Sequence, residues 1–199
     1  DGVLHVARGC RGTAQVNMRV GDRPVMSMRF TGIYTTPTAA SNPSVTLTAW
    51  KTPQVVTDAN TQDTTFGGTH NASVAPAITG GTIYPSQGIE IDVGNSVNFT
   101  PLLGGETVDI TQRTVTGRIT LDLTAAQEVT LIDAVEDGTL QSLGLIHGTV
   151  ANQKVMLWMP SVQLTNAQKA DLNGKRLVSF DLRVLPSSGN DELRIVTSF

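Results

Sequence analysis

The sequence predicts a mainly β protein, an antiparallel β-sandwich or barrel of about ten strands with one flanking helix. Charged residues make up only 16% of the chain and threonine is abundant, a composition that suits half-exposed strands. Short segments alternate between apolar and polar residues along most of the chain, and only one segment has helical spacing. Many short strands with a single helix favour a sandwich or barrel over a βαβ fold.

The first predicted element is a β-hairpin over residues 12–35. Alternation places Ala14, Val16 and Met18 on one face, and Gly21 with Asp22 forms the turn. Apolar residues resume the same period after the turn, so we expect one face against the core and one in water. A shorter strand is predicted over residues 45–49.

Residues 58–88 predict a long loop or arm. The periodicity disappears there and Gly, Thr, Asn, Pro and Ser dominate, with the pairs Gly67-Gly68 and Gly80-Gly81 as turn signals. A structureless excursion of about 30 residues is uncommon in a compact domain. We therefore expect an arm that is functional or ordered by a partner.

Alternation returns after the arm and predicts three or four strands before the helix. These strands lie around residues 89–93, 97–99, 108–110 and 119–123.

The one predicted helix covers residues 124–137. Thr124 and Gln127 fit a capping box, and Gly138 stands where a helix commonly ends. Val129, Ile132 and Val135 recur at helical spacing, so we expect this stripe to pack on the outside of the sandwich.

The last third of the chain predicts four strands, around residues 143–146, 154–164, 178–184 and 193–199. Trp158 is expected to be buried inside the second of them. Residues 165–172 fit either a single helical turn or an exposed loop, and Asn173-Gly174 marks a turn.

Charge and hydropathy exclude several functional classes. The chain has 14 basic and 17 acidic residues among 199, a net charge of −3, which is unlike a nucleic-acid-binding polycation. Tight nucleic-acid binding is therefore not expected. The longest apolar run is far short of the roughly 20 residues that cross a bilayer, so no membrane partner is expected either.

No catalytic, cofactor-binding or metal site is expected. Cys10 is the single cysteine and lies between Arg8 and Arg11, but a lone small thiol at a strand start is more often a packing residue. His5, His70 and His147 share no metal-ligand spacing.

Two further patterns have structural explanations. Glu90 and Asp92 share one face of a strand, where they are expected to face solvent opposite the apolar side. The sequons at residues 71–73 and 98–100 are expected by chance in a Thr- and Ser-rich chain. The two tryptophans and two tyrosines, Trp50, Trp158, Tyr34 and Tyr84, are too few for a carbohydrate platform.

Four segments together resemble the tail tube, or major tail, proteins of long-tailed bacteriophages and prophages. Their order and spacing along the chain also match that family, although Gln112-Arg113 replaces the family's usual Asp-Arg pair. The segments are residues 11–38, 109–117, 145–149 and 181–192.

The resemblance implies a structural virion protein that assembles in the bacterial host cytoplasm, without enzymatic activity or cofactor. Its partners would be copies of itself, in rings of six subunits or pseudo-hexameric rings of three, and the stacked rings would conduct DNA. The tape measure, terminator and tip proteins would be further partners.

The resemblance also implies a division of the chain. By this resemblance, roughly a hundred further residues would precede the position of Asp1, which would explain why the sequence does not begin with methionine. Residues 1–50 would then be the closing strands of a preceding, truncated tube-like module, and residues 51–199 a tail-tube-like sandwich domain. The alternative from another class is an extracellular β-sandwich binding module, such as a lectin or adhesin, which the threonine content also suits.

Overall fold

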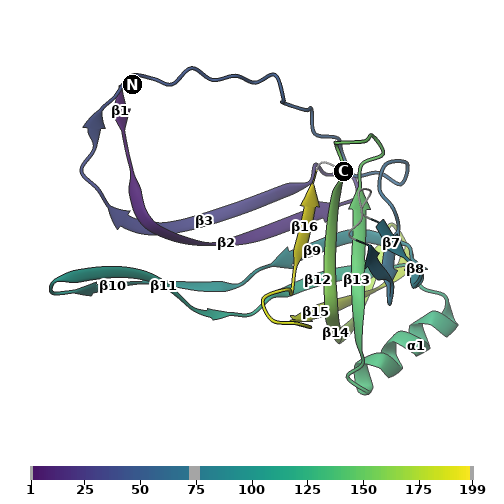
Figure 1. Cartoon of the computed structure of the whole chain (residues 1–199). Coiled ribbons are helices and arrows are strands. Elements are labelled where there is room, and N and C mark those ends of the chain that lie inside the picture. Colours follow the sequence, from purple (N-terminus) through teal and green to yellow (C-terminus); the bar gives the residue numbers. More distant parts are fainter. Residues whose placement is uncertain (1, 72–76, 198–199) are drawn as a thin grey trace.

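The computed structural model describes residues 2–71 and 77–197, and it confirms a mainly β fold with one helix (Figure 1). Ten strands form a single antiparallel sheet in the order β3-β2-β9-β12-β15-β14-β13-β5-β8, with β16 paired to β14. Three two-stranded pairs, β1-β4, β6-β7 and β10-β11, complete the described strands. The strands are β1 (Val3–Leu4), β2 (Ala7–Arg19), β3 (Val25–Tyr34), β4 (Thr38–Ala39), β5 (Thr64–Phe66), β6 (Thr69–Asn71), β7 (Ala77–Thr79), β8 (Thr82–Tyr84), β9 (Ser86–Asp92), β10 (Asn95–Leu102), β11 (Gly105–Arg113), β12 (Thr116–Leu121), β13 (Leu140–His147), β14 (Val155–Leu172), β15 (Lys175–Leu185) and β16 (Arg194–Thr197).

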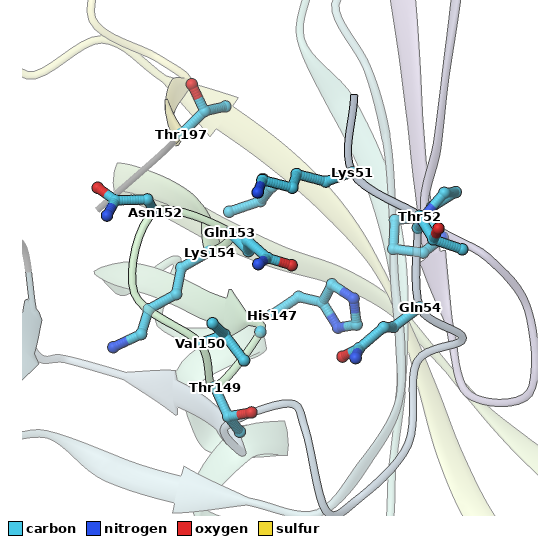
Figure 2. A pocket seen from close by; sticks show the side chains of 14 residues that line it. Lys51, Thr52, Gln54, His147, Thr149, Val150, Asn152, Gln153, Lys154 and Thr197 are labelled. Atoms are coloured by element: carbon cyan, nitrogen blue, oxygen red, sulfur yellow. The ribbon is translucent and has the colours of Figure 1, made fainter. Parts of the chain in front are cut away.

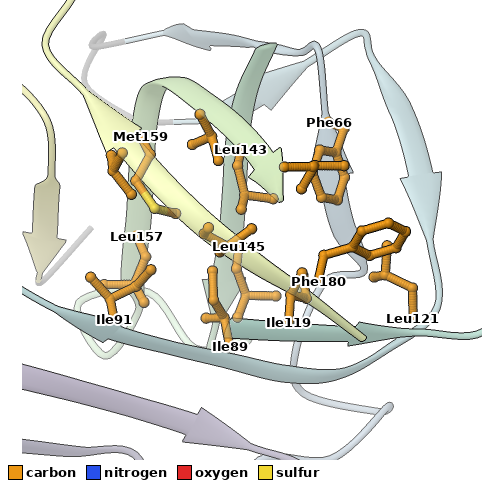
Figure 3. Packing of buried hydrophobic residues seen from close by; sticks show 14 of the residues in the cluster. Phe66, Ile89, Ile91, Ile119, Leu121, Leu143, Leu145, Leu157, Met159 and Phe180 are labelled. Atoms are coloured by element: carbon orange, nitrogen blue, oxygen red, sulfur yellow. The ribbon is translucent and has the colours of Figure 1, made fainter. Parts of the chain in front are cut away.

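The large sheet folds over itself into a sandwich. Strands β9, β12 and β15 supply one layer, and β5, β8, β13 and the first half of β14 supply the other, with the core between them (Figure 3). Ile119 and Leu121 from the first layer and Leu143 and Leu157 from the second are at most 1% exposed. Because side chains alternate along a strand, each layer turns every second residue inward. The fold class predicted by the sequence is thus confirmed.

A second, smaller core lies on the opposite face of β13 and β14. Met156 and Trp158 are buried there with Ile146, and Ile78 of β7 packs against them. Gly144 is required beneath this contact, since a Cβ at that position would lie 2.4 Å from Ile78 Cδ1. Burial on both faces of β14 explains why its sequence is continuously apolar at this point.

The predicted helix is confirmed as α1 (Ala125–Glu136), but its buried side chain is not the one expected. Thr124 and Gln127 form both hydrogen bonds of the capping box, and Gly138 has a φ of 65° just after the end. Leu131 is the buried residue of the helix, whereas Val129 is 59% exposed. Of the expected stripe, Val135 packs against the core, whereas the Val129 contact is wrong because the helix turns Leu131 to the core instead. No helix of the described residues is long and apolar enough to cross a membrane.

The long loop expected over residues 58–88 is wrong for the part that the structure describes. Four three-residue strands, β5 to β8, and the beginning of β9 occupy it, and Phe66 and Tyr84 enter the main core with ring centroids 5.5 Å apart. Residues 72–76 lie outside the described residues. Three-residue strands are too short for their alternation to be recognised, and the glycines at positive φ supply the turns between them.

Two smaller expectations are also corrected. Residues 45–49 form no strand and are exposed, because no neighbouring strand pairs with them. Residues 165–172 are neither a helical turn nor a loop, since β14 continues through them in register with β15. The irregularity is a bulge between Thr165 and Gln168, where Asn166 has a φ of 50°. The expected turn at Asn173-Gly174 is confirmed, with φ values of 53° and 83°.

Candidate functional site

Two long hairpins project from the same side of the sandwich (Figure 1). Strand β2 pairs with β9 only through residues 15–19, so its first half is paired in the sheet only with β3. Strands β10 and β11 pair only with each other. The hairpins therefore extend well beyond the hydrophobic core.

The bases of the hairpins are tied firmly to the rest of the fold. Asn95 donates from its backbone N to Thr13 Oγ1 at 3.1 Å and from Nδ2 to the Gly12 carbonyl at 2.8 Å. Arg113, opposite Asn95 at the base of the β10-β11 hairpin, binds Glu192 at 2.6 Å and Asn190 at 2.9 Å. These contacts fix the direction in which both hairpins leave the sandwich.

The apolar face of the β2-β3 hairpin is exposed along its outer half. In β3, Met26 is 41%, Met28 59% and Phe30 63% exposed, although these residues lie on the same sheet face as the buried Val16 of β2. One face of this hairpin was expected to be covered; Val16 and Met18 of β2 confirm this, but the expectation is wrong for β3, where the sandwich does not cover the same face. The face of the sheet that forms the core thus continues outward without a cover.

The tip of the β10-β11 hairpin is apolar as well. Leu102 is 62% exposed and Leu103 is fully exposed at the turn, where Gly104 has a φ of 86°. Burying a leucine side chain stabilises a protein by about 1.5–3 kcal/mol. Exposed leucines and the uncovered face of β3 are features that protein-binding surfaces commonly have.

Both hairpins carry long unpaired edges, with β3 at the end of the large sheet and β10 and β11 in a pair of their own. Among the described strands, β3 has ten residues, β11 nine and β10 eight, and each pairs on one side only. The other terminal strands, β8 and β16, have three and four residues. Short edge strands protect a protein against unwanted pairing, whereas long exposed edges are templates for another chain.

The outward face of the sheet carries balanced charges. Glu90 lies 3.2 Å from Arg19, and Asp92 accepts hydrogen bonds from Gln15 Nε2 at 2.7 Å and from the Gly94 backbone N at 2.8 Å. The expectation that these two carboxylates face away from the core is therefore confirmed. Both carboxylates contact neighbouring residues of the same sheet and its turn, and neither has the buried, unpaired setting of a general acid.

A cavity of about 300 Å³ opens beside His147, at the end of β13 (Figure 2). His147 Nδ1 lies 2.8 Å from the Thr61 hydroxyl, and the Gly148 backbone N donates to the Asn60 carbonyl at 2.7 Å. Burial lowers the pKa of His147, and a backbone hydrogen bond with Gln54 acts in the opposite direction. These contacts fasten residues 54–61 to β13, so His147 has the structural role that an apolar strand suggests.

The other predicted candidate residues are not brought together. His5 is exposed between β1 and β2, and Cys10 of β2 is an exposed free thiol whose Sγ lies 3.4 Å from the Ala7 carbonyl. His70 packs its ring 5.8 Å from the ring of Trp158, and burial, with Arg194 nearby, lowers its pKa. Within residues 2–71 and 77–197, no group of three or more His, Cys, Asp or Glu side chains could hold a metal ion.

The large aromatic residues are divided between core and surface. Trp158 and Tyr84 are buried, whereas Trp50 and Tyr34 are 70% and 77% exposed. They lie on different segments, so they form no row of rings for a sugar.

A comparison with protein families identifies the family of this chain. A family model described as phage tail tube protein matches residues 1–184, which is most of the chain. The chain belongs to the phage tail tube family. A comparison with curated proteins finds no significant match.

Membership confirms the resemblance seen in the sequence and makes the protein a structural component of a phage tail in the virion. Tail tube proteins associate with copies of themselves and with other tail proteins, so exposed apolar strands are the expected functional surface. Sequence reasoning missed the edges that carry this surface, β3 and β11. Alternation shows that a strand has an apolar face, but it does not show whether another strand of the same chain covers its edge.

Proposed function

We propose that this tail tube protein assembles into rings, that the rings stack into the tube of the phage tail, and that the tube conducts DNA. The family match carries the proposal, and the two projecting hairpins with long open edges support it. The protein acts through its shape and contacts, without enzymatic activity or cofactor. Assembly takes place in the bacterial host cytoplasm before the virion is released.

Two different open edges favour growth in one direction. A contact between unlike surfaces leaves one free surface at each end of the assembly, so copies add until a ring closes. The rings contain six copies, or three if each full-length subunit contributes two tube-like modules. Exposed tips such as Leu103 are available for the next ring, and the tape measure, terminator and tip proteins bind the ends of the stack.

The division of the chain remains part of this proposal. Residues 1–50 would close a preceding module and residues 51–199 would form the second one. In the chain itself β2 joins the same sheet as the second part, through its pairing with β9. A pseudo-hexameric ring of three subunits would follow if the preceding module has the same fold.

The charges suit a passive conduit. Arg19 and Arg118, on the outward face of the sheet, have Glu90 and Asp181 as partners, at 3.2 Å and 3.9 Å. Paired arginines release few counterions on meeting a phosphate, so they add little affinity for DNA. A net charge of −3 acts in the same direction. DNA would pass such a wall without being held.

Negative-stain microscopy with light scattering tests the proposal. We expect the purified chain to form rings or hollow rods as its concentration rises. A particle that stays monomeric at every concentration, and in mixtures with purified phage tail proteins, would contradict the tube function and favour a lectin-like or adhesin-like module.

DNA passage has a separate test by fluorescence anisotropy with duplex DNA. We expect affinity no better than the non-specific range, roughly 10⁻⁴ M at physiological salt. Micromolar affinity with a steep dependence on salt would contradict a passive conduit.

A further inference from the structure

Residues 41–53, here called the strap, are exposed and form neither helix nor strand. Figure 1 shows the strap leaving the β1-β4 pair and returning to the sandwich apart from β2 and β3. Residues 54–62, the anchor segment, attach its returning end. We propose that His147 is a proton-sensitive latch, whose neutral ring holds the anchor segment at the end of β13 and whose protonation releases the segment and the strap with it. This inference concerns the single chain and does not depend on ring formation.

Hydrogen bonds, more than burial, hold the anchor segment in place. Within residues 54–62, all of which the structure describes, only Val56 is buried. Val56 exchanges two backbone hydrogen bonds with the turn between β2 and β3, at 2.8 Å to Asp22 and 2.9 Å to Gly21. At the other end, the Gln62 backbone N donates to the Ile146 carbonyl of β13 at 2.8 Å. A segment with so little buried apolar surface opens at a lower free energy than the core.

The His147 ring contacts the anchor segment at two points (Figure 2). Nδ1 lies 2.8 Å from Thr61 Oγ1, and a backbone hydrogen bond with Gln54 acts to raise the pKa, as a carbonyl does when it accepts from a ring N–H. A neutral imidazole carries one N–H, so with that proton on the Gln54 carbonyl, Nδ1 accepts the proton of the Thr61 hydroxyl. The neutral ring therefore bonds both ends of the segment.

Protonation changes this arrangement. Nδ1 becomes a donor, so the Thr61 hydroxyl has to turn its proton away from the ring, toward Asn60 Oδ1 at 3.0 Å. His147 is only 6% exposed, and burial is the largest cause of its lowered pKa. A buried cation without a counter-charge is unfavourable, so acid favours the open segment, in which the ring is hydrated.

The charged groups around the ring do not compensate for its burial. Lys51 of the strap and Lys154 line the cavity of about 300 Å³ beside His147, and none of the described residues that line it is a carboxylate (Figure 2). Asp58 and Asp63 of the connecting chain line neighbouring cavities instead. A protonated ring would thus be a further positive charge beside two lysines.

Hydrogen exchange followed by mass spectrometry tests the latch, with the 199-residue chain dilute enough to be monomeric and each rate corrected for the intrinsic effect of pH. In the open state His147 regains its ordinary pKa of 6.5, so opening becomes at most about 30-fold more favourable at pH 5 than at pH 7.5. We expect the protection of residues 54–62 to fall severalfold within that bound in the wild type and to change little in H147Q. The control is H5Q, which replaces an exposed histidine and should behave as the wild type.

Two further measurements separate a latch from a change in overall stability. Low urea should leave exchange in residues 54–62 unchanged while it speeds exchange in β15, because global unfolding exposes far more surface than a local opening. T61V removes the hydroxyl that Nδ1 binds and should lower the protection of the segment already at pH 7.5.

Three results would overturn the latch and leave the proposed tube function untouched. They are an equal pH dependence in the wild type and H147Q, exchange in residues 54–62 that follows urea as β15 does, and wild-type protection in T61V. If circular dichroism shows that H147Q does not fold, the urea and T61V measurements decide by themselves.

Discussion

Leu131 attaches the only helix of the described residues to the sandwich, and its replacement gives a sharp test of the packing. Its side chain is 2% exposed and belongs to the main core, although it lies on a surface element. Truncation of a buried leucine to alanine removes its transfer free energy and leaves a cavity, which together cost about 2–5 kcal/mol. Because alanine favours helices at least as well as leucine, the loss in L131A comes from packing alone. We expect a decrease of about 3 kcal/mol in the free energy of unfolding.

Urea unfolding followed by circular dichroism measures this change, with V129A as the matched control. Val129 is on the same helix but 59% exposed, so V129A removes little buried surface and gains helix propensity. We expect V129A to lie within about 0.5 kcal/mol of the wild type or slightly above it. If L131A unfolds like the wild type, or if V129A is the more damaging change, the helix faces the sandwich differently and the argument fails.

Two further predictions concern a histidine and a glycine. Burial lowers the pKa of His147 from its ordinary 6.5, so the folded state favours the neutral ring. The contribution of His147 to stability is therefore fully present above about pH 6.5 and is lost as the pH falls through the lowered pKa of the folded state. Between pH 7 and pH 5, the wild type should lose more stability than H147Q in urea unfolding, and an equal loss would show that His147 is not responsible. Gly88 has a φ of 97° and an added Cβ would lie 1.9 Å from the Met18 carbonyl oxygen, so G88A should cost more than about 2 kcal/mol. G105A, in open space, should stay within about 0.5 kcal/mol in the same assay, and similar values for the two would refute the close approach.

Signals within a few residues of sequence were sufficient to predict the helix and the long strands. The capping box of Thr124 and Gln127 and the glycine at 138 predicted α1 because each acts through bonds within a few residues. Long alternating strands, such as those around Val16 and Phe180, were found for the same reason. Strands of three residues carry too short a pattern, so the segment containing Phe66 and Tyr84 resembled a loop.

The features of the candidate site were likewise predicted only in part from the sequence. The sequence indicated that Glu90 and Asp92 face away from the core, because alternation with buried isoleucines decides which way they point. It did not indicate that the apolar side of β3 lies uncovered. That depends on where the opposite layer of the sandwich ends, which is a property of strands distant in sequence.

The sequence by itself determined that this protein is a β-rich member of the tail tube family with one capped helix. Composition, alternation and motif order can all be read from the chain without knowing which segments come into contact. Only the tertiary structure decided which strands are edges and which residues on them remain unpaired. Strand order results from contacts between segments far apart in the chain, such as β2 with β9 and β13 with β5. Alternation is identical for a central strand and for an edge strand. The open edges of β3 and of the β10-β11 hairpin could therefore be recognised only in the folded chain.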